Sequence, residues 1–478
     1  MGGAGAADLL GAFKDVFTVS PQGEIALLRP EALQGEATDR LVRSAVFGNP
    51  DEAAAARWLV RDLARIRGVL PASIQPLYEA MGRGEAGGFT TPALNLRGMA
   101  YDMARAAVRA LLDLEAGPVV FELARSEMRY ASQSPEEYAT VVLAAALREG
   151  YSGPLFIQGD HFQVNAKKFR AGSAARDGEM GALRDLVADA VRAGFYNIDI
   201  DASTIVALER GSVQDQQRDN FETQADLTAL VRRLQPPGVV ISVGGEIGEV
   251  GGRNSTPEEF RAFMDGLNEA LARRAGAVPG ISKVSIQTGT THGGVPLPDG
   301  TVAKVAIDFE CLRALSDIAR REYGLAGAVQ HGASTLPAEA FGEFPKHGAA
   351  EVHLATEFQN LALDHGEFPR ELRSEMYAWV ASHCAAERQA GMTDGQFLYK
   401  ARKNAWGPFK AETWGLPEAV RAALRATLQA KFASLFRQLG VAGGRPAAGR
   451  FVRPAEVRPP PPAALIAEEG ISACMSES

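Results

Sequence analysis

Short apolar segments alternate with amphipathic segments through the middle of the chain. The eight apolar or β-branched segments begin at Pro92, Pro118, Pro154, Tyr196, Val239, Lys283, Ala326 and Ala349. Their starts are 23 to 44 residues apart, and most of the gaps place apolar residues at helical spacing, as in 99–114 and 257–274. Eight strands that alternate with helices predict an α/β fold, a (β/α)8 or TIM barrel, over residues 86–365.

An open, doubly wound sheet is the alternative α/β fold. Such a sheet normally carries a glycine-rich fingerprint directly after its first strand. The corresponding segment here, Leu94-Asn95-Leu96-Arg97, contains no glycine. The sequence therefore favours the closed barrel.

Helical patterns extend beyond the predicted barrel on both sides. Residues 1–85 form a mostly helical N-terminal extension, which a glycine-rich boundary separates from the barrel. Residues 366–441 form a helical C-terminal extension, where the apolar stripe of 418–439 predicts packing on the barrel or on a partner subunit. Residues 442–478 are rich in proline and predict a disordered tail.

The composition is that of a globular protein and narrows the classes of partner. Of the 478 residues, 46% are hydrophobic and 23% charged, and a net charge of −8 argues against a nucleic acid or an anionic membrane as partner. We expect a cytoplasmic protein, because neither a signal peptide nor an apolar run of about 18 residues is present. Cys311, Cys384 and Cys474 are far apart, which argues against a disulfide framework or a thiolate metal site.

Histidines follow several predicted strands, at the end where barrels hold their active sites. Segments 284–293 and 328–334 both lead into His-Gly, at His292 and His331, with one helical pattern between them. This spacing brings two imidazoles to the same end of neighbouring strands, and a metal site is then favoured over two hydrogen-bonded core histidines. With His161 at the end of the third strand, three histidines suit a catalytic divalent cation with an open coordination position.

Carboxylates accompany these histidines. Glu246, after the fifth strand, is a candidate for an additional or exchanging metal ligand. Asp160 is a candidate general acid/base, although it directly precedes His161 and neighbours on an extended strand point to opposite faces. Asp201 or Asp199 could serve a second cation or orient a ligand histidine, and Asp201 could also cap the next helix.

Small residues after the last strands suggest a phosphate site. Gly293, Gly332 and Ser334 follow the two histidines, and Thr356 follows the eighth strand. In barrels, backbone N–H groups of these loops often bind phosphate. Tight turns are the structural alternative.

Seven short segments, in order over about residues 89–360, resemble the class II, metal-dependent ketose-bisphosphate aldolases. The segments are Pro92-Ala-Leu-Asn95, Gly159-Asp160-His161, Ile200-Asp201-Ala-Ser203, Glu246-Ile-Gly with Gly251-Gly252, Gly289-Thr-Thr-His292-Gly293, His331-Gly-Ala-Ser334 and Leu354-Ala-Thr356-Glu357. The last three are most similar to the tagatose-bisphosphate branch. A class I, Schiff-base aldolase fits less well, because Lys283 lies at the wrong end of its strand.

The resemblance implies reversible cleavage of a phosphorylated ketose, of the fructose- or tagatose-bisphosphate type, to dihydroxyacetone phosphate and an aldehyde. It implies zinc, or another divalent metal, that polarises the ketose carbonyl to stabilise an enediolate. The metal ligands would be His161, His292 and His331, with Glu246 as an alternate ligand and Asp201 as a further metal-site residue. Asp160 would move the proton of the C4 oxygen. The contacts to the substrate or its C1 phosphate would be Asn95, Gly293, Gly332, Ser334, His353 and Thr356. A monovalent cation and a homodimer or homotetramer are further expectations.

Three features depart from the family pattern. Gln158 stands where the family usually has histidine, and His353 where it usually has asparagine. The acidic loop after Gly251-Gly252 is short, and its glutamate would need a substitute among Glu249, Glu258 and Glu259. The Gly-Asp-His segment and the helical C-terminus also resemble ketose-epimerase and companion-subunit relatives. A metal-dependent C4-epimerase and a non-catalytic companion subunit therefore stay open as alternatives.

Overall fold

A computed structural model describes residues 5–247, 253–289 and 307–465. The chain forms two compact units. One comprises residues up to 70, 140–153 and those from 456 on, and the other comprises 71–139 and 154–455. Among the described residues, no helix has both the length and the apolar character that crossing a bilayer requires.

The first unit contains helices and one antiparallel hairpin. Its elements are α1 (Ala6–Phe13), β1 (Phe17–Val19), β2 (Ile25–Leu27), η1 (Pro30–Gln34), α2 (Glu36–Phe47) and α3 (Pro50–Ile66). Helix α3 begins at a proline, and the Asn49 side chain caps it by accepting a hydrogen bond from the Glu52 N–H at 3.0 Å. Residues from 456 on also pack in this unit, where Arg458 donates to the buried Asp62 carboxylate at 3.0 and 3.1 Å.

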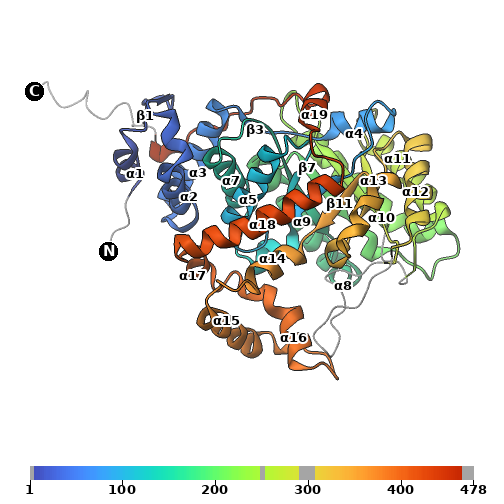
Figure 1. The fold of residues 1–478 in the computed structure, drawn as a ribbon. Coiled ribbons are helices and arrows are strands. Elements are labelled where there is room, and N and C mark those ends of the chain that lie inside the picture. The colour runs from blue at the N-terminus through green and yellow to red at the C-terminus, as the bar shows by residue number, and fades with distance from the viewer. Residues whose placement is uncertain (1–4, 248–252, 290–306, 466–478) are drawn as a thin grey trace, which may run out of the picture. The chain divides into compact units, whose positions relative to one another are not determined.

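Eight parallel strands of the second unit close into a barrel, which confirms the predicted (β/α)8 fold (Figure 1). They are β4 (Thr91–Asn95), β5 (Val120–Ala124), β6 (Gly153–Gln163), β7 (Asn197–Asp201), β8 (Ser242–Glu246), β9 (Lys283–Ile286), β10 (Ala328–Gln330) and β11 (Glu351–Leu354). Each strand pairs with the next, β11 pairs with β4, and β6 carries the short β3 (Val69–Pro71) as an additional neighbour. Nearly all strand residues are buried, as both faces of a parallel barrel are covered.

Helices connect the strands and surround the barrel (Figure 1). They are α5 (Ala100–Asp113), α6 (Arg125–Tyr130), α8 (Ala166–Arg170), α9 (Ser173–Ala193), α10 (Val213–Leu234), α11 (Pro257–Ala275), α12 (Phe309–Tyr323), α13 (Glu343–Lys346) and α14 (Thr356–Leu363). Helix α7 (Pro135–Arg148) begins in this unit, and its residues from 140 on belong to the first unit. Local sequence sets their ends. Helix α11, for example, starts with a capping box between Thr256 and Glu259, and α12 stops at Gly324, whose φ is +69°.

The N-terminal end of the barrel is closed by α4 (Gln75–Gly82) and the residues before it. The Ile74 N–H donates to the Asn197 side chain at 2.9 Å, and the Tyr78 hydroxyl donates to Glu351. Ile74, Tyr78 and strand residues such as Val120 form a buried apolar cluster. The opposite, C-terminal end of the barrel is left for a site.

The C-terminal extension is helical, with α15 (Arg370–His383), α16 (Asp394–Ala401), α17 (Lys410–Trp414) and α18 (Glu418–Gln438). The apolar stripe of α18, orange-red in Figure 1, packs on α5 and α14, and the Phe358 and Phe432 rings lie 4.7 Å apart. Of the two predicted packing partners, the stripe therefore contacts the barrel. The predicted disorder from 442 on is wrong for residues 442–465, which include α19 (Arg445–Phe451) with the buried Val452 after it.

Candidate active site

At the end of β6, two adjacent residues both point into the same cavity. The register of β6 with β7 shifts between Gly159 and Phe162, and His161 has a φ of +41°, a left-handed conformation that is strained for a residue with a side chain. On a regular strand Asp160 and His161 would face opposite sides, whereas the irregularity lets both line the cavity. Gly159 is needed here, because a Cβ at this position would lie 2.4 Å from the Phe162 ring.

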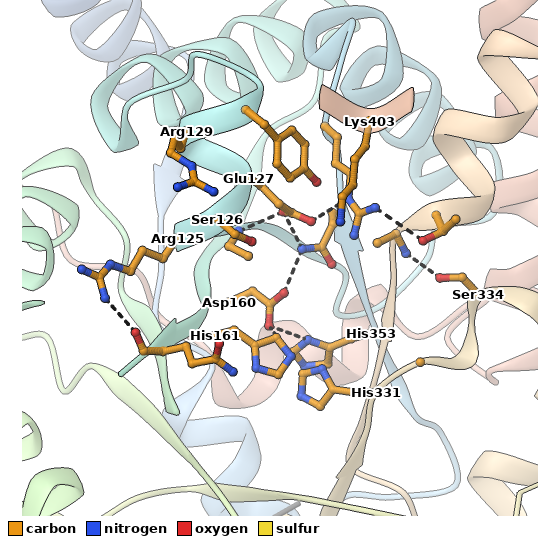
Figure 2. Close-up of a pocket in the computed structure, with 18 of the residues that line it drawn as sticks. Arg125, Ser126, Glu127, Arg129, Asp160, His161, His331, Ser334, His353 and Lys403 are labelled. Carbon is orange, nitrogen blue, oxygen red and sulfur yellow. Dashed lines mark hydrogen bonds and ion pairs between the residues drawn. The ribbon is translucent and has the colours of Figure 1, made fainter. Parts of the chain in front are cut away.

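Three histidines lie side by side in this cavity, which has a volume of about 630 Å³. Figure 2 shows His161, His331 and His353 together, with Asp160 beside them. The centroids of the His161 and His331 rings are 4.1 Å apart, and those of His331 and His353 are 4.0 Å apart. These residues come from β6, from the residue after β10, and from β11.

A divalent metal fits this group. Asp160, His161 and His331 each offer one ligand atom, and the three atoms lie within 4.8 Å of one another. The two imidazoles, in a largely buried place, suit zinc or a related cation, and the Asp160 carboxylate lies beside them. The predicted third histidine ligand, His292, and the neighbouring Gly293 lie outside the described residues.

Two further carboxylates contact the other side of His161. Its Nδ1 atom lies 3.0 Å from Glu246 and 3.3 Å from Asp201. Burial disfavours the charged ring, but Asp160 and Glu246 raise the pKa of His161 well above its ordinary value. Asp201 is itself held by the Ser203 N–H at 3.0 Å and hydroxyl at 2.7 Å. Carboxylates on one ring nitrogen orient the other nitrogen, and His161 is held in that way.

Asp160 is fixed from two directions. The Asn95 side chain, at the end of β4, donates to Asp160 at 2.9 Å, and His353 Nδ1 lies 3.2 Å from the other carboxylate oxygen. Burial favours the neutral acid, but His161 and His353 lower the pKa of Asp160 well below its usual value. The carboxylate is therefore ionised, which is the state that a general base has before it takes a proton.

The predicted phosphate residues line another wall of the cavity. Gly332 has a φ of +71°, and the Ser334 hydroxyl accepts a hydrogen bond from the Ala355 N–H at 2.7 Å. Thr356 is the first residue of α14 and lines the cavity with them. The arrangement places an alcohol, a helix start and a glycine turn together, as an anion site requires.

Two cations lie beside this wall that sequence reasoning missed. Arg97 donates to the Thr356 hydroxyl at 3.4 Å and pairs with Glu127 at 2.6 Å. Lys403 comes from η7 (Arg402–Ala405), and burial followed by the nearby Arg97 charge lowers its pKa. Arg97 carried a sequence signal, since it stands two residues after Asn95 at a strand end. Lys403 carried none, since it lies far beyond the last strand.

In the part of the chain that the structure describes, no proposed substitute for the loop glutamate lines the cavity. Glu259 belongs to the cap of α11, where it also pairs with Arg253, and neither it nor Glu258 lines the cavity. Glu249 lies outside the described residues. His353 lines the cavity as expected, but both of its ring nitrogens face carboxylates.

Comparisons with known proteins identify the family and support the fold. The family model described as fructose-bisphosphate aldolase class-II matches residues 75–406. A probable tagatose 6 phosphate kinase from Sinorhizobium meliloti 1021 superposes with a TM-score of 0.52 at 18% identity, covering 75% of this chain and 100% of that one, and supports the fold alone.

Two further solved structures are similar at lower scores. The fructose-bisphosphate aldolase of Campylobacter jejuni gives a TM-score of 0.48 at 17% identity, over 78% of this chain and 96% of that one. The fructuronate-tagaturonate epimerase UxaE of Cohnella laeviribosi gives 0.48 at 12% identity, over 83% and 86%. The family match covers more than half of the 478 residues, and the protein therefore belongs to the class II fructose-bisphosphate aldolase family, as a metal-dependent lyase.

Proposed function

We propose that the protein reversibly cleaves a phosphorylated ketose, of the fructose- or tagatose-bisphosphate type, to dihydroxyacetone phosphate and an aldehyde. The observation that carries this proposal is the meeting of Asp160 with His161 and His331 in one cavity, with ligand atoms within 4.8 Å. An acid/base beside a metal site is the chemistry that a retro-aldol cleavage needs.

The protein's own residues have distinct roles in this reaction. Zinc on His161, His331 and the predicted His292 would, when bound, polarise the ketose carbonyl. Asp160 accepts the proton of the C4 hydroxyl as the C3–C4 bond breaks, and the electron pair of that bond passes toward C2. C3 must then gain a proton to give dihydroxyacetone phosphate. Asn95 keeps the Asp160 carboxylate turned toward the cavity through their 2.9 Å hydrogen bond. A monovalent cation and a homo-oligomer stay predictions.

The charge of the cavity supports an anionic substrate. Its described lining contains five Arg or Lys side chains and three Asp or Glu side chains, before the charge of any metal is added. Such an excess attracts phosphorylated sugars. Gly332, Ser334 and Thr356, with Arg97 and Lys403 beside them, would bind the C1 phosphate.

Metal-dependent C4-epimerisation of a ketose is the second candidate. Retro-aldol cleavage and re-addition in place use Asp160 twice and require no separate acid for C3. Neither Glu258 nor Glu259 lines the described cavity, so among the described candidates none is placed to act as such an acid.

The deciding experiment incubates zinc-loaded protein with fructose 1,6-bisphosphate and, separately, with tagatose 1,6-bisphosphate. Triose phosphate release, followed with sugar identity by NMR, supports the aldolase. Interconversion of the two ketoses without release replaces it by the epimerase. No change with either sugar, in protein that holds zinc, overturns both and leaves another substrate or a companion-subunit role.

A further inference from the structure

Charged and polar residues, rather than apolar ones, fill the barrel beneath Asp160. The set comprises Lys283 on β9, Glu351 and His353 on β11, Gln158 on β6, Glu122 on β5 and Asp199 on β7. Each is at most 6% exposed. Burying so many charged groups is costly unless each has an oppositely charged or hydrogen-bonding partner, so the stability of the set depends on the partners of each side chain.

Lys283 is the centre of this set. Its ammonium contacts the Glu351 carboxylate, lies 3.0 Å from Asp199 and donates to the Gln158 side-chain oxygen at 2.8 Å. Lys283 and Glu351 are absent from the lining of the cavity described above. They are therefore placed to act on the site only through other residues.

Glu351 connects Lys283 to His353. One Glu351 oxygen lies 2.7 Å from His353 Nε2, and the same oxygen accepts from the Gln158 amide at 2.9 Å. The Gln158 amide also donates to Glu122 at 2.8 Å. Gln158 and His353 are the two strand positions that depart from the family pattern, and both bind Glu351. The two departures are thus parts of one network.

His353 joins the network to the reactive groups. Its Nδ1 atom lies 3.1 Å from Glu122 and 3.2 Å from Asp160, and its ring contacts that of His331, with 4.0 Å between centroids. Because carboxylates contact both ring nitrogens, the ring cannot rotate without losing a hydrogen bond on each side.

We propose that Lys283 and Glu351 are positioning residues, which fix His353 and, through it, the direction of the Asp160 carboxylate. The inference rests on the proposed function, in which Asp160 moves the proton of the C4 oxygen. Removing the Lys283 charge leaves Glu351 and Asp199 without the cation that they share, so the His353 ring turns. Asp160 then loses its contact with His353, one of the two side chains that fix its carboxylate.

The test compares wild type with Lys283→Met, which keeps the length of the side chain and removes its charge. Crystal structures of both proteins locate His353 and Asp160, and zinc content and kinetics on the ketose that the wild type turns over are measured alongside. We expect altered positions of both side chains, a kcat lowered by about tenfold or more, a KM changed by less than about threefold, and unchanged zinc content.

Two further variants keep the test decisive. Arg425→Met breaks another buried ion pair of the same unit, with Asp102 on α5, and should lower stability without lowering kcat. Glu351→Gln retains an acceptor for His353 and should lower kcat less than Lys283→Met does. If Lys283→Met does not fold, Glu351→Gln takes its place in the comparison.

Unchanged positions of His353 and Asp160 together with an unchanged kcat would overturn the inference. The crystallographic comparison needs no substrate, so it separates this outcome from a failure of the proposed function. In that second case the wild type cleaves and epimerises neither ketose, whatever the position of Asp160 in the variant.

Discussion

The ring of His331 lies against that of His161, with 4.1 Å between their centroids, although the two residues belong to opposite halves of the barrel sequence. β6 and β10 are not neighbours in the barrel, so only its closure brings the two rings together. This contact defines the metal site on which the first prediction rests.

Replacing His331 by alanine should remove a metal ligand. We expect zinc affinity to fall by more than about 100-fold, because even outer partners of a metal site are worth 10- to 100-fold. Zinc in dialysed protein, measured by mass spectrometry, checks this. His383→Ala is the matched control, since His383 is exposed on α15, and equal zinc in both variants would contradict the site.

Asp160→Asn should separate metal binding from proton transfer. The amide keeps the size of the side chain but cannot accept the C4 hydroxyl proton. We expect kcat to fall by about 10² to 10⁴, with zinc content retained. A variant with wild-type kcat would show that another group moves this proton.

Gly159→Ala should damage the bulge that presents His161. The new Cβ would lie 2.4 Å from the Phe162 ring, so we expect a loss of about 1–3 kcal/mol in the free energy of unfolding and weaker zinc binding. Gly178→Ala in α9 is the control, because nothing lies within 4 Å of its Cβ position and alanine favours a helix by about 0.5–1 kcal/mol. Urea unfolding distinguishes the two, and equal stabilities would refute the steric argument.

Lys403→Met should weaken binding of the phosphorylated substrate. The side chain lines the cavity beside Arg97, and loss of its charge should raise KM by about tenfold with a smaller change in kcat. Lys400→Met, at an exposed position three residues earlier, should leave KM unchanged. Similar KM values for both variants would remove Lys403 from the phosphate site.

Glu122 should make stability depend on pH. Burial raises its pKa to about 8, against about 4.3 for an unfolded glutamate. Between these values the folded protein holds a proton that the unfolded chain has released. The contribution of Glu122 to the free energy of unfolding is therefore fully present below about pH 4.3 and is lost as the pH rises through about 8. The loss is no more than about 1.4 kcal/mol per pH unit.

Glu122→Gln cannot titrate and should lack this contribution. Urea unfolding at several values between about pH 5 and pH 8 should give a shallower fall in the free energy of unfolding than wild type shows. Parallel curves for the two proteins would mean that Glu122 is ionised in the folded state.

The sequence by itself determined the barrel and which of its strand ends meet in the cavity. Eight apolar segments at regular intervals leave few alternatives, because parallel strands need helical crossovers and bury both faces. Strand ends converge in a barrel, so Asn95, Asp160, His331 and Thr356 could be assigned to one cavity from their positions in the sequence alone.

Only the tertiary structure decided which side chains meet inside that cavity. The left-handed turn at His161 accompanies a register shift in the pairing of β6 with β7, a contact between distant parts of the chain that local sequence does not encode. Lys403 reaches the cavity from a segment far beyond the last strand. From the sequence, Lys283 lies at the wrong end of its strand for a Schiff-base lysine. In the barrel interior it pairs instead with Glu351 on β11 and Asp199 on β7. Such long-range pairings depend on strand register and closure, which the period of a sequence does not specify.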